Sequence, residues 1–411
     1  MHELVGALRS YAWGSRTALA QLCGRPVPSA HPEAELWFGA HPADPAHVRI
    51  DGDSRSLLEL VSADPDRELG AAASEFGGRL PFLLKILAAE EPLSLQAHPS
   101  SAQARAGFER ENRTRVPLDS PMRNYRDENH KPELVVALDR FEALAGFRDP
   151  RRTVELFRAL DVPGLDPYAN LLAAQPDSAG LRTLFTTWIT LPHAALSKLL
   201  PQVLDGCVQY LSGGASLPKG RREFVAEART ALELAEAYPG DAGVLAALLL
   251  NRLTLEPGQG LFLAAGNLHA YLRGLGIEIM ANSDNVLRGG LTPKHVDVPE
   301  LLRVLDFEPI DLPVVLPEPV GDGSVCYRTP APEFALRRFD LIEGSAQVPL
   351  TAAGPGIVLC TSGSVRLLHG SSQLVLERGA AAWISAADTD IRAQAVDGNA
   401  QLFCACVGGP N

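Results

Sequence analysis

The sequence predicts a mainly β protein with one all-helical insertion. Two observations carry this expectation. The 411 residues include 32 prolines and 36 glycines, which is typical of many turns and short strands. Short apolar segments of strand character also lie on both sides of a stretch, residues 150–250, in which the hydrophobic period is helical. A chain of this length exceeds one ordinary core, so we expect two or three domains.

The first hundred residues favour strands and turns with one or two short helices. Residues 80–87 (LPFLLKIL) form an apolar run broken only by Lys85, which indicates a buried strand. Residues 101–128 are polar and change character midway, so the first half is expected to be a helix and the second half a loop.

The helical insertion is expected over 150–249. Its helical segments are 151–160, 194–211 and 220–238. Pro201 should start or kink the second of these helices. In the third, four residues share one helical face: Val225, Ala228, Leu232 and Ala235.

Strand patterns return at residue 253 and continue to the end of the chain. Residues 253–272 hold a Pro-Gly turn between two apolar runs, 298–307 reads as a helix, and 313–330 reads as a proline-rich linker. Short alternating segments of strand character follow: 334–342, 356–368, 372–386 and 401–409.

One internal echo links the two β regions. Residues 253–265 (LTLEPGQGLFLAA) resemble 374–386 (LVLERGAAAWISA), and the Glu-x-Gly of one aligns with the Glu-x-Gly of the other, 121 residues apart. Two β-sandwich domains of similar make-up would produce such an echo. Chance is the alternative explanation for so short a match.

Composition limits the partners. The formal net charge of −12 argues against nucleic acid and anionic membranes, so an anionic substrate needs a local cluster of Lys and Arg. Six cysteines without a CxxC pair indicate no disulfide framework, and Cys404 and Cys406 read as buried thiols. No signal peptide or run of 18 apolar residues is present, so we expect a cytoplasmic protein without a transmembrane helix.

Two short segments carry candidate metal ligands. In SLQAHPS (94–100), Gln96 and His98 are two residues apart and would face the same side of a strand. In NHKPELVVAL (129–138), Glu133 opens a strong strand pattern and follows His130 and Lys131. The alternatives are a surface histidine in a turn before a proline, and a solvated charged turn.

The third segment, 265–295, is dense in ionisable and aromatic side chains among five glycines that allow close backbone approach. Its candidates are His269, Tyr271, Glu278, Asp284, Arg288, Lys294 and His295. Two histidines, one glutamate and one glutamine suit Zn²⁺, with Mn²⁺, Fe²⁺ or Co²⁺ as alternatives. A neutral glutamine leaves the ion with net positive charge, which favours a Lewis-acid role at a carbonyl or enediolate oxygen.

Seven stretches, in this order, resemble the type I mannose-6-phosphate isomerase family. They are YAWGS (11–15), AELWFGAHP (34–42), LPFLLKIL (80–87), SLQAHPS (94–100), NHKPEL (129–134), GNLHAYL (266–272) and NSDNVLRGGLTPKHVD (282–297). The resemblance runs from residue 11 to about 306 and more weakly to the end.

The resemblance implies a cupin (jelly-roll) fold. A second cupin motif can be traced at Gly258, Gly266 and His269, with Ala264 in place of its proline. The first motif is poorly kept, since the acidic ligand lies 35 residues after His98, a displacement that the isomerase family itself shows. The implied domains are a metal-binding catalytic cupin (1–149 with 250–312), the helical domain (150–249) and a cupin-like β domain (313–411).

The resemblance also implies one Zn²⁺ per chain and reversible interconversion of mannose 6-phosphate and fructose 6-phosphate through a cis-enediol. Its implied metal ligands are Gln96, His98, Glu133 and His269. Arg288 is expected nearest the reacting carbons, and the further catalytic candidates are Lys131, Glu278, His130 and Asp284. The residues expected to meet the phosphate or the reacting oxygens are Lys85, Lys131 and Lys294, with Tyr271 as a further substrate contact.

Other residues are expected to be structural. These are Trp13, Trp37, His41 and His295. Asp390 stands where the echo would place a counterpart of His269, so the C-terminal domain is predicted to bind no metal and to serve packing or solubility.

The family also implies a monomer that acts on a small sugar phosphate. The rival readings are a cupin oxygenase or hydrolase, which would normally use iron and a histidine-rich set, and a non-catalytic sugar-phosphate sensor. A sensor needs no proton-transfer set, so the presence of Lys131 and Arg288 argues against it.

Overall fold

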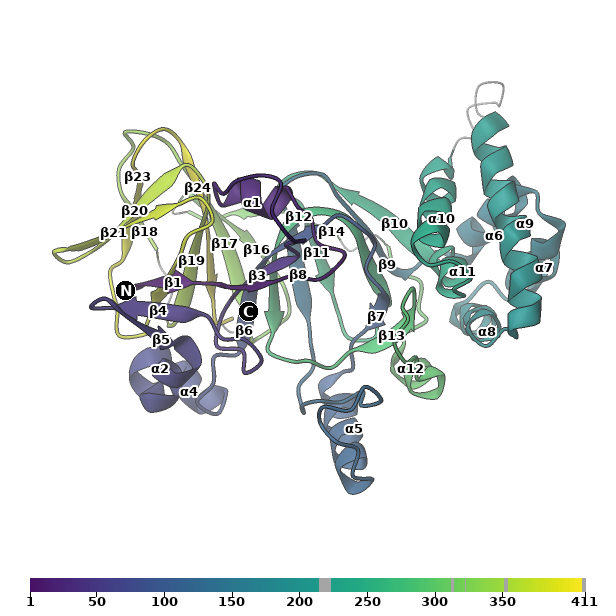
Figure 1. Cartoon of the computed structure of the whole chain (residues 1–411), viewed down its shortest axis with the longest axis horizontal. Coiled ribbons are helices and arrows are strands. Elements are labelled where there is room, and N and C mark those ends of the chain that lie inside the picture. Colours follow the sequence, from purple (N-terminus) through teal and green to yellow (C-terminus); the bar gives the residue numbers. More distant parts are fainter. Residues whose placement is uncertain (214–222, 312–313, 322, 351–353, 409–411) are drawn as a thin grey trace.

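The computed structural model describes residues 1–213, 223–311, 314–321, 323–350 and 354–408. Its layers follow one another along the long axis of the molecule (Figure 1). The C-terminal strands lie at one end, a second set of sheets lies in the middle, and a group of helices lies at the other end. The mainly β architecture with a helical insertion is therefore as predicted. Within the described residues, no helix is long and apolar enough to cross a membrane.

The C-terminal β unit is formed by a nine-stranded and a four-stranded sheet. The order of the larger sheet is β15 (Glu318–Pro319), β16 (Ser324–Tyr327), β17 (Ala335–Leu341), β24 (Ala400–Cys406), β19 (Gly356–Ser362), β22 (Ala381–Ile384), β1 (His2–Val5), β4 (His47–Ile50) and β5 (Asp53–Ser56). The order of the smaller sheet is β18 (Val348–Pro349), β23 (Arg392–Ala395), β20 (Ser364–His369) and β21 (Ser372–Glu377).

Strand pairing near the N-terminus joins two of the predicted domains, 1–149 with 250–312 and 313–411. Strand β1 pairs with β22 in antiparallel register, and β4 and β5 extend the same sheet. The first sixty residues therefore contribute to both β units, although the sequence assigned them to the catalytic domain alone. The predicted boundary between these two domains, at 312–313, lies outside the described residues.

The central β unit is an eleven-stranded sheet that folds back on itself around the long strand β12 (His269–Ala281). One part runs β14 (Val314–Val315), β11 (Gly260–Leu263), β8 (Glu133–Ala137), β12, β6 (Phe82–Ala89), β3 (Glu35–Phe38) and β2 (Ala7–Arg9). The other part holds β9 (Phe141–Phe147), β10 (Leu250–Leu255), β7 (Leu95–Ala97) and β13 (Leu287–Gly290). The predicted strand at 80–87 corresponds to β6.

Alternation along the strands separates the core layers, because successive side chains of a strand face opposite sides. On β8, Leu134 and Val136 pack against the C-terminal β unit, together with Phe334 and Phe403. Glu133 and Val135 face the interior of the central unit instead, where an apolar cluster fills part of the space. The remaining interior of the central unit is polar and holds the candidate site.

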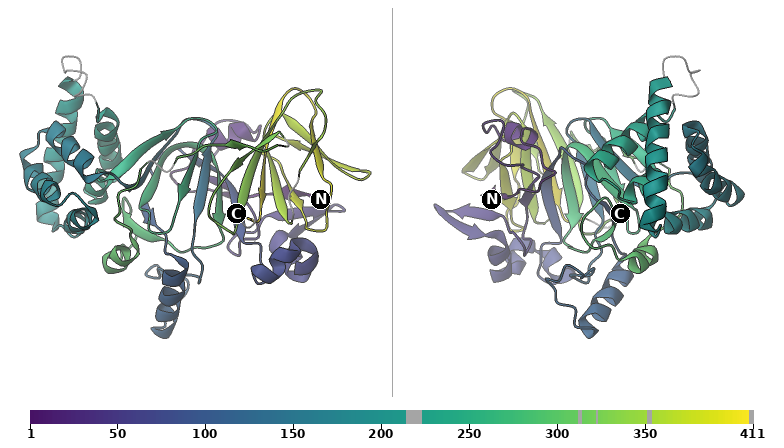
Figure 2. Two further views of the ribbon diagram at one scale, coloured as in Figure 1. Left: turned by 180° about the vertical axis from the view of Figure 1, so that it is seen from behind. Right: turned by 45° about the vertical axis from the view of Figure 1, so that its right-hand side comes forward.

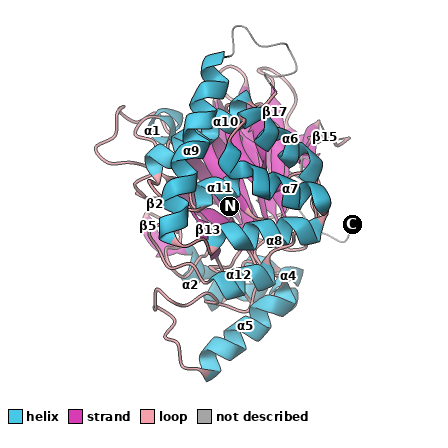
Figure 3. Ribbon diagram, turned by 90° about the vertical axis from the view of Figure 1, so that its right-hand side faces the viewer, coloured by secondary structure: helices cyan, strands magenta, loops and turns pink. Residues whose placement is uncertain are grey.

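The helical insertion consists of α6 (Pro150–Leu160), a 3₁₀ turn (Pro163–Leu165), α7 (Asp166–Ala174), α8 (Ser178–Ile189), α9 (His193–Ser212), α10 (Val225–Ala237) and α11 (Gly243–Ala247). Pro201 lies inside α9, not at its start. Residues 220–222 of the third predicted helix lie outside the described residues. Figure 3 shows these helices in front of the strands, and their core includes Leu144 and Phe147 of β9 and Leu287 of β13.

The remaining helices lie outside the β layers, as the two further views show (Figure 2). They are α1 (Ala18–Leu22), α2 (Leu57–Ala63), α3 (Pro65–Leu69), α4 (Ala71–Glu75), α5 (Ser101–Arg113) and α12 (Val298–Val304). Four of them precede residue 100, where one or two were predicted. Helix α5 and the loop after it match the predicted division of 101–128, and α5 begins with a capping box at Ser100.

The echoed segments adopt the same local structure. Gly258 N donates to Ala137 O (2.8 Å), and Gly379 N donates to Cys360 O (2.8 Å) in the C-terminal unit. In each turn the amide after the glycine returns to the glutamate carbonyl, at 3.0 and 2.9 Å. Both glycines have positive φ, 88° and 80°, which L-residues with a side chain rarely adopt. The two segments are therefore equivalent strand–turn–strand units.

Candidate metal centre and active site

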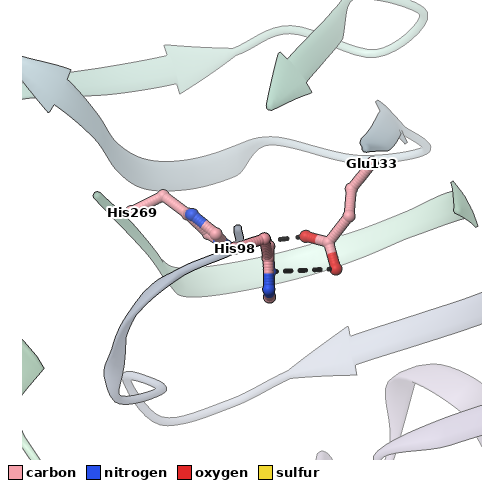
Figure 4. Close-up of side chains that lie close together, drawn as sticks. All are labelled: His98, Glu133 and His269. Carbon is pink, nitrogen blue, oxygen red and sulfur yellow. Dashed lines mark ion pairs between the residues drawn. The ribbon is translucent and has the colours of Figure 1, made fainter. Parts of the chain in front are cut away.

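Three predicted ligands meet inside the central β unit (Figure 4). His98 Nε2 lies 3.4 Å from Glu133 Oε1, and His269 Nε2 lies 3.5 Å from Glu133 Oε2. One donor atom from each residue lies within 4.8 Å of the others, and all three side chains are buried. This spacing and this set of two imidazoles and one carboxylate are suited to a metal ion such as Zn²⁺.

Strand pairing explains why these residues meet. Gln96 of β7 lies opposite His269 of β12 and also opposite Arg288 of β13. Residues directly opposite in antiparallel strands project to the same face, so these three side chains form a row across the sheet. His98 follows Gln96 by two residues and shares its face. The amide nitrogen of Gln96 donates to Ser94 Oγ (3.2 Å), which leaves its carbonyl oxygen for the cluster.

Each histidine is oriented by a hydrogen bond from its other ring nitrogen. His98 Nδ1 lies 2.8 Å from Asn285 O, and His269 Nδ1 lies 3.0 Å from Asn267 O. Since a carbonyl only accepts, each Nδ1 carries the proton and each Nε2 keeps its lone pair. The Nε2 atom of His98 is buried without a hydrogen-bond partner. The residues present therefore fit a bound divalent metal.

The electrostatics of the cluster favour the metal-binding protonation state. Burial lowers the pKa of His98 to about 4, even though Glu133 opposes this shift. Burial alone would raise the pKa of Glu133, but Lys131 and His98 outweigh it and hold that pKa well below its usual value. Near neutral pH the cluster therefore presents a neutral imidazole at His98 and a carboxylate at Glu133.

A buried polar network lies beside the cluster on the same inner face. Lys85 of β6 is opposite Glu278 of β12, and Lys85 Nζ lies 2.8 Å from Glu278 Oε2. Tyr271 donates its hydroxyl proton to Glu278 Oε1 (2.8 Å). Lys85 Nζ also lies 3.4 Å from Glu35 Oε1. Three strands, β6, β12 and β3, thus place a buried cation between two buried carboxylates.

The protonation of this network follows from burial and pairing. Burial raises the pKa of Glu278 above its ordinary value, while Lys85 opposes that shift. Burial would lower the pKa of Lys85, but the neighbouring carboxylates reverse the shift and raise it. Burial and the nearby carboxylates raise the pKa of Tyr271. Glu278 is therefore more basic than an exposed carboxylate, and Lys85 stays charged.

Three cations gather beside the row of Gln96 and His269. Burial lowers the pKa of Arg288, and the positive charge of Arg126 lowers it further. Burial, Arg288 and Arg126 together lower the pKa of Lys294. In the part of the chain that the structure describes, no carboxylate forms an ion pair with any of the three. Cations that repel one another without a counter-ion are typical of an anion-binding site.

The other predicted residues occupy different places. Lys131 Nζ lies 3.2 Å from Glu133 Oε1 and so belongs to the cluster. His130 points away from it, because its Nε2 contacts Glu333 of the C-terminal unit. Asp284 is half exposed, and its Oδ1 lies 3.5 Å from Nε2 of the buried His41.

Three of the four residues that were expected to be structural pack against another aromatic ring. The indole of Trp37 is buried, donates to Glu35 Oε2 (2.9 Å) and lies beside the ring of His41. Trp13 stacks on Tyr11 at 5.6 Å between ring centroids. His295 is exposed and lies outside the cluster. Trp37 and His41 therefore belong to the wall of the site.

Sequence reasoning missed four residues that surround the site: Glu35, Arg126, Asn285 and Glu333. Two signals were present. Glu35 lies two residues before Trp37 on a strand, and Asn285 lies between two residues already singled out. Their contact partners, however, are remote in the sequence, so these side-chain contacts could not be predicted from the spacing of residues.

Comparison with known proteins agrees with this geometry. Residues 1–150 match the family described as phosphomannose isomerase type I, catalytic domain. Mannose-6-phosphate isomerase of Escherichia coli strain K12 is 38% identical over 95% of this chain and 96% of its own. The chain belongs to the type I mannose-6-phosphate isomerase family. The rat mannose-6-phosphate isomerase is 32% identical over 97% of the chain and 96% of its own.

Solved structures of this isomerase family share the whole fold. A zinc-bound holo mannose 6-phosphate isomerase superposes with a TM-score of 0.88 at 34% identity, covering 99% of each chain. A single-residue variant of phosphomannose isomerase from Salmonella typhimurium gives a TM-score of 0.89 at 34% identity over 100% of each chain. The mainly β architecture of this chain is thus the architecture of the isomerase family.

Proposed function

We propose that this chain is a zinc-dependent aldose–ketose isomerase that interconverts mannose 6-phosphate and fructose 6-phosphate through a cis-enediol. The observation that carries the proposal is the buried cluster of His98, Glu133 and His269, whose histidines are both oriented by backbone carbonyls. Family membership supports the reaction. A cupin fold with three domains, of which the C-terminal one also takes in β1, β4 and β5, is part of the same proposal.

The ligands of one ion per chain would be His98, Glu133 and His269, with Gln96 as the fourth. Gln96 is included because it lies opposite His269 and two residues before His98. When bound, a zinc ion supplies a positive centre that stabilises negative charge on the oxygens of the enediolate. Lys131, whose Nζ lies 3.2 Å from Glu133 Oε1, would hold that ligand in place.

Glu278 is our choice for the proton-transfer group. Isomerisation moves a proton between C2 and C1, so the base must accept a proton and return it to the neighbouring carbon. Burial makes Glu278 more basic, and Lys85 and Tyr271 hold its two oxygens in place. Asp284 is too exposed for this role, and His130 faces another unit.

The phosphate is expected at the three unpaired cations, Arg126, Arg288 and Lys294. Lys85 and Lys131 are less suitable because carboxylates already neutralise them. The planar guanidinium of Arg288 can hold two oxygens at once, and its position opposite Gln96 brings the substrate to the metal ligands. The monomeric state and cytoplasmic location remain predictions from the sequence.

The test is a coupled assay of the purified protein on mannose 6-phosphate before and after chelation, with zinc then restored. Turnover should vanish with chelation and return with zinc. No turnover at any metal loading would overturn the proposal. Iron at stoichiometric content with consumption of oxygen would indicate the oxygenase reading instead.

A further inference from the structure

Glu333 belongs to the C-terminal β unit, but its carboxylate reaches the segment that delivers Glu133. It lies in the connection between β16 and β17, and its Oε1 is 2.5 Å from His130 Nε2. The side chains of Glu333 and His130 are 15% and 26% exposed. The pair is therefore largely shielded from water, where a charge-assisted contact is stronger than at the surface.

One short segment contacts both units. His130, in the chain that leads into β8, contacts Glu333 of the C-terminal unit. Lys131 and Glu133 contact each other inside the site, with Lys131 Nζ 3.2 Å from Glu133 Oε1. A side chain that fixes His130 from outside therefore also fixes the orientation of its inward-facing neighbours.

The inner side of the same segment is already held by the central unit. Asn129 O accepts from Asn285 Nδ2 (2.8 Å) and from Ser283 Oγ (3.2 Å). Ala281 N donates to Pro132 O (3.1 Å). Asn285 also accepts the hydrogen bond that orients His98. The contact between Glu333 and His130 fixes the same segment from its outer side.

We propose that Glu333 is a positioning residue for the active site. Through His130 it fixes residues 129–133, and with them the directions of Lys131 and Glu133. The C-terminal β unit thus supports the reaction without placing a side chain among the reacting atoms. This inference rests on the proposed isomerase function, since the cost of a loose segment is expressed in turnover.

Other polar contacts between the two units provide controls. Tyr327 OH of the C-terminal unit donates to Gly258 O of the central unit (2.9 Å). Trp383 Nε1 donates to Glu68 Oε2 of helix α3 (2.7 Å). Neither contact involves the segment 129–133. Loss of such a contact should weaken the packing of the units without disturbing the site.

The experiment compares Glu333→Ala, Glu333→Gln and Tyr327→Phe in the full-length zinc protein. Glu333→Ala should lower kcat about 10- to 100-fold with a smaller change in KM, because small misplacements of reacting groups cost rates of this order. Glu333→Gln keeps an acceptor for His130 and should recover most of kcat. Tyr327→Phe should keep wild-type kcat.

A second readout does not depend on turnover. Hydrogen exchange of peptides spanning residues 129–135 in the metal-free protein should be faster in Glu333→Ala than in wild type, and unchanged in Tyr327→Phe. If Glu333→Ala does not fold, His130→Ala removes the same contact from the other side and should show the same loss of kcat and faster exchange.

Wild-type kcat and exchange in a folded Glu333→Ala would overturn the inference. So would equal losses in Glu333→Ala and Tyr327→Phe, since those would mean general destabilisation. If the wild-type protein shows no isomerase activity, the proposed function fails. The exchange measurement then still decides whether Glu333 holds the segment.

Discussion

In both β units an equivalent turn joins two strands, β10 to β11 in the central unit and β21 to β22 in the C-terminal unit. The hydrogen bonds and the positive-φ glycine are the same in the two turns. The interiors behind these turns differ. The central unit buries Lys85, Glu133 and Glu278. The C-terminal unit buries an apolar cluster that includes Val358, Val365, Leu367, Leu376 and Leu402.

In the C-terminal unit, other residues stand at the positions equivalent to two predicted metal ligands of the central unit. Ala137 and Cys360 accept the same turn hydrogen bond, and four residues before them stand Glu133 and Gly356. The alignment of the two repeated segments makes the exposed Asp390 the equivalent of His269. The same strand–turn–strand arrangement therefore encloses a polar candidate active site in the central unit and an apolar core in the C-terminal unit. Buried charges cost several kcal/mol each unless paired, so the site must keep its charges in contact.

The largest expected effect comes from His269→Ala, set against Asp390→Ala. Removing a ligand should lower zinc affinity by more than about 100-fold, since changes to second-shell partners alone cost about 10- to 100-fold. Turnover should fall with zinc content, measured by metal analysis and the coupled assay. Asp390→Ala should change neither. Full zinc occupancy in His269→Ala would contradict the ligand set.

Arg288→Ala should separate phosphate binding from metal binding. We expect kcat/KM to fall about 10- to 100-fold, as for loss of a charge-assisted hydrogen bond of about 1.5–3 kcal/mol, while zinc content and circular dichroism stay unchanged. The matched control is Arg392→Ala, an exposed arginine of the C-terminal unit. Near-normal kcat/KM of Arg288→Ala would mean that the phosphate site is misplaced.

The stability of the metal-free protein should depend on pH through His98. Its folded pKa of about 4 lies below the ordinary 6.5, so the unfolded chain takes up the proton first as pH falls. Stability should therefore decrease from about pH 6.5 down to about 4, by at most roughly 3 kcal/mol.

Urea unfolding across this pH range measures that effect. His98→Gln should flatten the slope, and zinc should shift the loss to lower pH because the ion and the proton compete for the same nitrogen. An equal slope in His98→Gln would assign the pH dependence to other groups.

The smallest expected effects concern the two equivalent turn glycines. Alanine at either position adopts an unfavourable positive φ, which costs roughly 1–2 kcal/mol. A Cβ at Gly258 would meet the end of the flexible Arg338 side chain at 2.6 Å. A Cβ at Gly379 would meet Cys23 Sγ at 2.5 Å and its Cα at 3.0 Å. Gly379→Ala should therefore lose more free energy of unfolding, measured with urea, and equal losses would contradict this reading of the turns.

The parts of this comparison that the sequence predicted are local ones. Alternation placed Gln96 with His98, the helical period located the insertion, and the repeated Glu-x-Gly indicated two β domains of similar make-up. These depend on spacing within a few residues, which strand and helix geometry fix directly.

The rest depended on pairing between remote segments. Strands β1, β4 and β5 have four residues each, too few to show which sheet they join. Lys85 read as a phosphate candidate because its partners, Glu35 and Glu278, are 50 and 193 residues away. His130 read as catalytic because nothing near it in sequence revealed Glu333.

The helical insertion has a consequence for how such a chain can change. It leaves β9 at Phe147 and returns to β10 at Leu250, and these two residues are paired. In the C-terminal unit the corresponding strands, β20 and β21, are joined by only Gly370 and Ser371. By connectivity, therefore, the helices are an attachment that could be exchanged for a hairpin without altering the register of the sheet. By solvation they are indispensable, because their removal would expose to water the apolar outer face that they now cover, including Leu144, Leu272 and Leu287.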